Sequence, residues 1–180
     1  DNVTLTGNSA GVSIGLGTMA NPGNGGGIHL SGTTNTNISN STILGNFAAR
    51  EGGGLWNNAG TMTVESTSLD ANDAQGVAAD DGGGAIFNNG GTLIIQNTTS
   101  ITNNTATGSS GSGGGILSTD GIVTIDTSII TNNTSNRAGG GIELIEGTLN
   151  LTNTTLNLNT TGSAPGNGGG LHITGAANPN

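Results

Sequence analysis

The chain has 180 residues but no cysteine and no lysine, and its only basic side chains are Arg50 and Arg137. Without cysteine, neither disulfides nor thiolate-bound zinc can stabilise the fold. Two basic against eleven acidic side chains give a net charge of −9. This charge excludes a nucleic-acid partner, because nucleic-acid binding requires a basic surface that displaces counterions. It also argues against recruitment to an anionic membrane surface.

Aromatic residues and long apolar runs are scarce as well. Aromatic residues make up 2% of the sequence, and no run of about 18 apolar residues occurs, so no direct membrane insertion is predicted. No signal peptide is visible, and Asp1 is interpreted as the start of a mature chain or of an excised fragment. A polar, acidic composition without lysine or cysteine is typical of an extracellular or cell-surface bacterial protein.

Glycine, in contrast, is abundant, with 36 residues, and it recurs in a pattern. Glycine-rich motifs followed by Ile or Leu begin at Gly25, Gly52, Gly83, Gly113, Gly139 and Gly168. A second motif, an aliphatic residue followed by two others and asparagine, ends at Asn8, Asn46, Asn72, Asn104, Asn133 and Asn159. From each glycine motif to the next asparagine there are 20 or 21 residues, whereas the return distance varies from 6 to 17. One fixed and one variable arc indicate stacked coils with insertions confined to one loop.

Three short strands are predicted in each fixed arc. Residues 61–64 and 92–95 alternate with period 2 and are rich in threonine and β-branched residues, which is typical of strands. No segment has helical periodicity. One coil cannot bury an apolar face alone, but a stack can. The sequence therefore predicts an all-β, right-handed parallel β-helix (β-solenoid) of about six coils. It forms a single domain over residues 1–180, or one unit of a longer repeat array or fibre.

Equivalent positions of successive coils are expected to stack. The six asparagines of the second motif are predicted to form a structural ladder in a tight turn, with each amide bonding to the coils above and below. The outward positions of the first strand form a candidate exposed contact stripe. Its members are His29, Trp56, Phe87, Leu117, Glu143 and His172. Exposed aromatic residues mark a contact surface for sugar rings or for a neighbouring molecule. The alternative is that the variable loops cover the stripe.

Two motifs resemble those of a known family. Gly83-Gly84-Ala85-Ile86 matches the GGAI motif of the polymorphic outer-membrane proteins, which are bacterial autotransporter adhesins, and the aliphatic-x-x-Asn motif is similar to that family's FxxN. The resemblance extends over the whole chain. It implies a right-handed β-helix on a bacterial surface, without implying a particular receptor.

No catalytic residues are predicted. Glycosidases need two facing carboxylates, whereas the acidic residues here are scattered along the sequence. Glu143 is expected beside His172 of the next coil, which we interpret as a cross-strand surface pair rather than an acid–base pair. The scarcity of Arg and Lys argues against a lyase for acidic sugars, which must neutralise substrate carboxylates.

No metal site and no cofactor are predicted, with calcium as the alternative. Asp70, Asp73, Asp80 and Asp81 surround one variable loop, and calcium prefers several carboxylate oxygens. The nonapeptide calcium-binding repeat is absent, which favours solvated loop acids.

The composition and repeats favour a non-enzymatic structural or adhesive module. Two alternatives remain open: a carbohydrate-binding or carbohydrate-active β-helix, and an ice-binding protein. Ice binding would use an outward threonine array that consists of Thr61, Thr63, Thr92, Thr124 and Thr148.

Both ends of the sequence are expected to fall within a coil. The chain begins in a third strand with Val3 and Leu5 and stops after a first strand with Leu171 and Ile173. A second copy placed directly after Asn180 would have its ladder asparagine 20 positions after the last glycine motif, the spacing found inside the chain. The sequence thus predicts head-to-tail self-association through these four apolar residues, with a glycan or cell-surface molecule as a further candidate partner.

Overall fold

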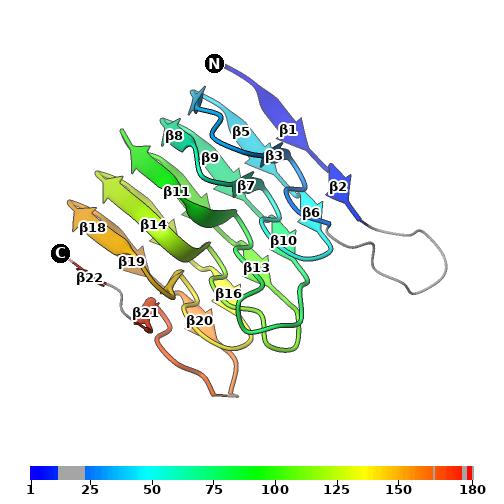
Figure 1. The fold of residues 1–180 in the computed structure, drawn as a ribbon, viewed down its shortest axis with the longest axis vertical. Helices are drawn as coiled ribbons and strands as arrows, with labels where there is room; N and C mark the ends of the chain where they lie inside the picture. The colour runs from blue at the N-terminus through cyan, green and yellow to red at the C-terminus, as the bar shows by residue number, and fades with distance from the viewer. Residues whose placement is uncertain (12–22, 164, 176–177, 180) are drawn as a thin grey trace.

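The computed structural model describes residues 1–11, 23–163, 165–175 and 178–179. Within these residues the chain forms strands and turns, and none of it is a helix able to cross a membrane. The strands stack as a parallel β-solenoid of about five turns, with the first and last strands at opposite ends of the stack (Figure 1). The predicted all-β solenoid is confirmed. The count is about five because six layers of strands are joined by five turns of chain.

One six-stranded sheet is built from the strands that lead into the ladder asparagines. Its order is β1 (Thr4–Thr6), β5 (Thr42–Leu44), β9 (Ser68–Asp70), β12 (Ser100–Thr102), β15 (Ile129–Thr131) and β19 (Thr155–Asn157). All its pairings are parallel, and the register places each motif's aliphatic residue beside that of the next turn, as Leu5 beside Ile43. The inward column is apolar because the motif repeats an aliphatic residue at that position.

A ten-stranded sheet holds the strands that follow the glycine motifs. It contains β3 (Ile28–Leu30), β4 (Thr36–Ser39), β7 (Leu55–Asn57), β8 (Thr61–Glu65), β11 (Ile86–Gln96), β14 (Ile116–Asp126), β17 (Ile142–Leu144), β18 (Thr148–Thr152), β21 (Leu171–Ile173) and β22 (Asn178–Pro179). In the two central turns the predicted first and second strands are continuous, with a register shift near Asn89. The chain also goes one strand beyond the predicted stop, because β22 pairs with β18.

A third sheet of two-residue strands was not predicted. It consists of β2 (Ser9–Ala10), β6 (Phe47–Ala48), β10 (Asp73–Ala74), β13 (Thr105–Ala106), β16 (Thr134–Ser135) and β20 (Thr160–Thr161). The expectation of three strands per coil is therefore wrong for this arc. Two residues are too few to show an alternating pattern, so only the stacking of turns reveals them as strands.

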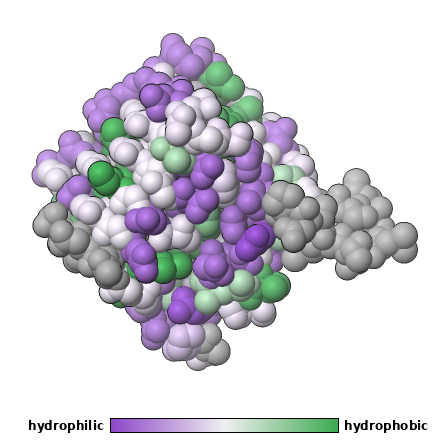
Figure 2. Space-filling view, in the orientation of Figure 1, coloured by the Kyte–Doolittle hydropathy of each residue, from purple (hydrophilic) through white to green (hydrophobic). Residues whose placement is uncertain are grey.

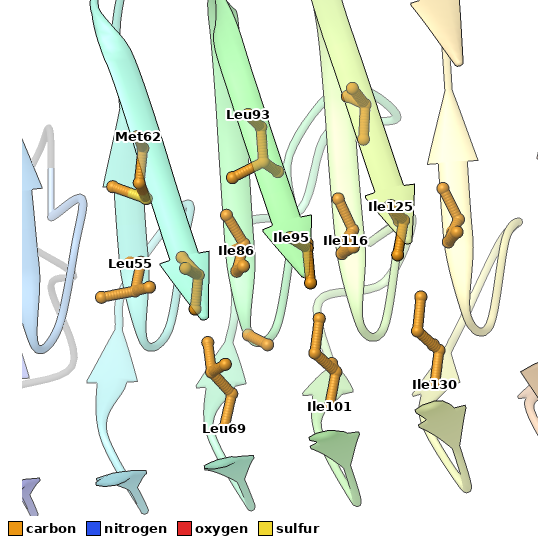
Figure 3. Close-up of a cluster of buried hydrophobic side chains, with 14 of the residues drawn as sticks. Leu55, Met62, Leu69, Ile86, Leu93, Ile95, Ile101, Ile116, Ile125 and Ile130 are labelled. Atoms are coloured by element: carbon orange, nitrogen blue, oxygen red, sulfur yellow. The ribbon is translucent and has the colours of Figure 1, made fainter. Parts of the chain in front are cut away.

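The core between the sheets is a set of aliphatic ladders. Figure 3 shows Leu55, Ile86 and Ile116 in one column, with the neighbouring ladders pointing toward them. These side chains are fully buried, and burial of each Leu or Ile side chain contributes about 1.5–3 kcal/mol. The half-buried members of the core belong to the first and last turns and are Leu5, Ile28, Leu30, Leu151, Leu156, Leu171 and Ile173.

The glycine motif is required by two different constraints. Its first glycine has a positive φ, for example +66° at Gly83, which other residues rarely adopt. Its second glycine touches neighbouring backbone, because a Cβ on Gly84 would lie 2.3 Å from the Gly114 carbonyl oxygen and 2.4 Å from that of Thr105. The expected role of the glycines in a sharp turn is therefore incomplete, since close contact between turns also requires them.

Candidate functional site

The six stripe residues lie in one column across the outer side of the first strands. The register pairs them in the order His29, Trp56, Phe87, Leu117, Glu143 and His172. The rings of His29 and Trp56 stack with centroids 4.3 Å apart, and those of Trp56 and Phe87 with centroids 6.2 Å apart. The column itself is as expected, and its environment decides its function.

The centre of this column is buried, so the expectation of an exposed contact stripe is wrong there. Trp56 is 7% exposed, Phe87 2% and Leu117 0%, and with Ile145 they form a second apolar cluster outside the main core. The alternative of a covered stripe therefore holds. Leaving these groups in water would cost about 25 cal/mol per Å² of apolar surface, which favours loops that fold over them.

The front of the molecule in Figure 1 shows no apolar stripe either. In Figure 2 hydrophobic residues appear on this face as separate patches between polar ones. Isolated apolar residues of this kind are normal for a soluble surface.

A buried carboxylate fixes one loop against the covered stripe. The Trp56 indole Nε1–H donates to Glu51 Oε2 over 3.0 Å, and Asn24 Nδ2 donates to the same oxygen over 3.0 Å. Arg50 Nε lies 3.4 Å from Glu51 Oε1 and donates to Asp81 Oδ1 over 2.8 Å, which joins two adjacent loops. Burial raises the pKa of the Glu51 carboxyl above its usual value, although the indole N–H and the guanidinium oppose this effect.

Removal of the buried charge at Glu51 should change the pH dependence of stability. A carboxyl whose pKa is raised in the folded state stabilises the fold below its unfolded pKa, and this contribution is lost as the pH rises through the folded pKa. Glu51→Gln should therefore gain melting temperature relative to the wild type at pH 7, and gain less or none at pH 4. Thermal melts at both pH values measure this difference.

Glu65 offers a control of opposite sign. It is exposed, and hydrogen bonds from Gln96, Asn37 and Asn97 lower the pKa of its carboxyl. A lowered pKa stabilises the fold above the unfolded pKa, and this contribution disappears at low pH. Glu65→Gln should lose melting temperature relative to the wild type more at pH 7 than at pH 4. The same sign for both variants would contradict the assignment.

A second buried carboxylate, Glu143, ties the last described first strand to its neighbour. His172 Nδ1 lies 2.8 Å from Glu143 Oε2, and Arg137 Nη1 lies 3.6 Å from Glu143 Oε1. Glu143 is fully buried, so the expected surface pair is instead an interior one. Burial raises the pKa of the Glu143 carboxyl, while His172 and Arg137 act in the opposite direction.

The cleft beside this cluster does not present an acid–base pair. It has a volume of about 240 Å³ and is lined by Ala79, Asp80, Arg137, Ile145 and Thr174. Asp80 supplies the one carboxylate among these lining residues. Glycoside hydrolysis needs two carboxylates on either side of the bond, and this cleft does not provide them.

The four loop aspartates do not assemble a calcium site in the described part of the chain. Asp70 and Asp73 accept hydrogen bonds from threonine, asparagine or glutamine side chains, and Asp81 is bonded to Arg50. Asp80 lines the cleft described above. Among the described residues no group of three or more acidic or histidine side chains could hold a metal ion.

The threonine array expected for ice binding is interrupted. The register aligns Thr61, Thr92 and Thr148 in one column, but Ile122 lies between the last two and is 46% exposed. The parallel column interleaves Thr63 and Thr124 with other residue types.

The sole tryptophan reports directly on the covered stripe. Because Trp56 is buried and hydrogen-bonded to Glu51, its fluorescence in the folded protein should be blue-shifted and only weakly quenched by iodide. Unfolding in urea should shift the emission to the red and restore quenching. Emission in the native state that matches the urea-unfolded chain would show that the stripe is open to solvent.

The six ladder asparagines form an unbroken chain of hydrogen bonds. At each step the backbone N–H and side-chain Nδ2 of one asparagine donate to Oδ1 of the asparagine in the next turn, as Asn72 does to Asn104 over 2.9 Å in both cases. Nδ2 also donates to a carbonyl of the preceding turn, as Asn104 does to Leu69. Asn72, Asn104 and Asn133 are fully buried. The ladder therefore joins three consecutive turns at every asparagine.

The residue before each ladder asparagine has a left-handed backbone, which sequence reasoning missed. The positive φ angles belong to Gly7, Gly45, Ala71, Asn103, Asn132 and Leu158. Glycine and asparagine at four of these six positions are the signal that could have revealed it. This conformation directs the following amide into the stack.

The two end faces of the stack expose core and ladder together. On the first face, a hollow of about 150 Å³ opens among nine residues that include Val3, Leu5 and Ile43. On the last face, Leu171 and Ile173 are half-buried. The four residues predicted for head-to-tail contact thus lie on opposite faces of the solenoid.

Comparisons with known proteins add no family to this description. A scan against protein-family models, a search of curated proteins and a search of solved structures each found no match. The likeness to the polymorphic outer-membrane proteins therefore rests on the GGAI and aliphatic-x-x-Asn motifs, and the structure supports its coarser part, a parallel β-solenoid of repeated turns.

Proposed function

We propose that this chain is a non-enzymatic structural or adhesive module that acts outside the cell. The observation that carries this proposal is the asparagine ladder, which runs through the whole stack and ends in open groups at both faces. A ladder that repeats the same bonds at every turn is suited to building length, because each turn stabilises its neighbours in the same way.

The use of the charged groups supports the same proposal. Both arginines lie against buried glutamates, Arg50 beside Glu51 and Arg137 beside Glu143, so they hold loops on the solenoid. A catalytic acid or base must reach its substrate within hydrogen-bonding distance, and Glu143 is fully buried. The proposed extracellular bacterial location rests on the acidic, cysteine-free composition and on the motif resemblance.

Tandem proteins of one, two and three copies, joined directly from Asn180 to Asp1, test the structural role. If the module builds length, electron micrographs should show single straight rods that grow by about 30 Å per copy, six layers at about 4.8 Å each. Beads joined by flexible links would contradict the proposal.

A glycan array and a thermal-hysteresis measurement on the single copy test the alternatives. The structural role predicts no hysteresis and no cleavage of polysaccharides. Binding to one defined glycan without cleavage would identify the adhesive partner, whereas cleavage or hysteresis would replace the proposal by the carbohydrate-active or the ice-binding alternative.

A further inference from the structure

We infer that the two end faces of the solenoid are a hydrogen-bond acceptor face and a hydrogen-bond donor face, which bind each other so that a second copy of this chain adds head to tail. This inference rests on the proposed structural role and adds to it the partner and its orientation.

The asparagine ladder has a direction. At its last step the N–H and Nδ2 of Asn133 donate to Asn159 Oδ1 over 3.0 and 2.9 Å, and Asn159 Nδ2 donates back to the Ile130 carbonyl over 2.8 Å. The same three bonds recur, with the same direction, at each earlier step from Asn46 onward. Every asparagine therefore donates toward the C-terminal turn and accepts from the N-terminal one.

This direction makes the two faces different. Asn8 donates its N–H and Nδ2 to Asn46 Oδ1, while its own Oδ1 accepts no hydrogen bond from the described residues. Asn159 Oδ1 is occupied by Asn133, while no described residue accepts from the Asn159 N–H. The Leu156 carbonyl occupies the position that the Ile130 carbonyl has one turn earlier. The N-terminal face thus offers an acceptor and the C-terminal face a donor.

Only the head-to-tail arrangement pairs these groups. The Asn159 N–H and Nδ2 would donate to Asn8 Oδ1 of the second copy, and that copy's Asn8 Nδ2 would donate to the Leu156 carbonyl, which repeats the internal step. Two N-terminal faces would bring acceptor against acceptor, and two C-terminal faces donor against donor. Polar groups that are buried without partners are costly, so the ladder selects one orientation.

The apolar groups of the faces favour the same contact. The hollow at the N-terminal face is lined by Leu5 and Ile43, and the half-buried Leu156 and Ile173 lie on the opposite face. A second copy would remove both sets from water, which stabilises the contact. The net charge of −9 on each copy opposes association, so binding should strengthen as salt screens the repulsion.

This contact cannot close on itself. It joins two different surfaces and leaves one free face of each kind, so a third copy can add in the same way. A further turn of the same polypeptide would meet the same requirement for an acceptor at the C-terminal face.

Two single-face variants test the orientation. Leu5→Lys places a charge on the N-terminal face and Leu156→Lys places one on the C-terminal face. Sedimentation velocity at about 0.5 M NaCl, where electrostatic repulsion extends only a few ångströms, should show growing oligomers for the wild type and monomers for each variant alone. A 1:1 mixture of the variants should double the mass and stop there, because each retains one complementary free face.

Three results would overturn the inference. The first is a wild-type chain that stays monomeric at every concentration and salt level. The second is a variant that dimerises alone, and the third is a mixture that stays monomeric while the wild type associates. If circular dichroism shows that either variant fails to fold, Val3→Lys, at a position that is 45% exposed, and Ile173→Lys replace them. Straight tandem rods combined with a monomeric wild type would reject this contact and retain the proposed function.

Discussion

Asn104→Leu should lower the free energy of unfolding by at least about 3 kcal/mol, because several buried polar groups lose their partner at once and each costs about 1–3 kcal/mol. Asn104 is fully buried and accepts from the N–H and Nδ2 of Asn72. It also donates to Asn133 Oδ1 and to the Leu69 carbonyl. Leucine satisfies none of these groups except through its own backbone N–H. Urea unfolding followed by circular dichroism measures the loss.

Two control variants separate the ladder from a general effect of removing an asparagine. Asn89→Leu makes the same change at an exposed strand position and should cost less than about 1 kcal/mol, as most surface substitutions do. Asn103→Leu, next to the ladder and with a φ of 56°, should cost about 1–2 kcal/mol from backbone strain. Equal stability of Asn104→Leu and Asn103→Leu would contradict a structural role for the ladder.

Gly84→Ala should unfold the chain at room temperature or lower its unfolding free energy by more than about 3 kcal/mol, beyond the usual range for a single substitution. The added Cβ would lie 2.3 Å from the Gly114 carbonyl oxygen and 2.4 Å from the Thr105 carbonyl oxygen. Both atoms belong to backbone in the adjacent turn, so relief requires the turns to separate. The midpoint of thermal unfolding and the yield of folded protein report the effect.

Gly45→Ala is the matched control for this substitution. Gly45 has a φ of +62°, but an added Cβ would meet nothing within 4 Å. It should therefore show only the cost of a left-handed alanine, about 1–2 kcal/mol. If the two variants are equally stable, the glycine motif serves only the backbone angle, and the close approach between turns is not required.

These two predictions bear on how the solenoid can extend. Both the ladder and the second glycine act between turns, so each loss would weaken the stack at one layer and would do so in the same way at every equivalent position. If Asn104→Leu and Gly84→Ala behave as expected, the same bonds and contacts at an end face can stabilise an added turn. That is the physical requirement of the head-to-tail contact.

The sequence by itself determined the stack and its register. The nearly constant spacing from glycine motif to asparagine, and the period-2 alternation of residues such as Leu93 and Ile95, depend on contacts between equivalent positions of adjacent turns. In a solenoid such contacts recur at every repeat, so a periodic sequence reports them directly. The core ladders and the position of the asparagines could be read for this reason.

Only the tertiary structure decided the environment of the outer column and of the short strands. Trp56 and Glu143 point away from the core, and period-2 alternation assigns them to the surface. They are buried because variable loops, which do not repeat, fold over them and place Arg137 and Glu51 beside the column. The two-residue strands were hidden for a related reason, since their hydrogen bonds join turns and leave no pattern within one. Features that depend on contacts between non-repeating segments cannot be read from a repeat, because no periodic signal records them.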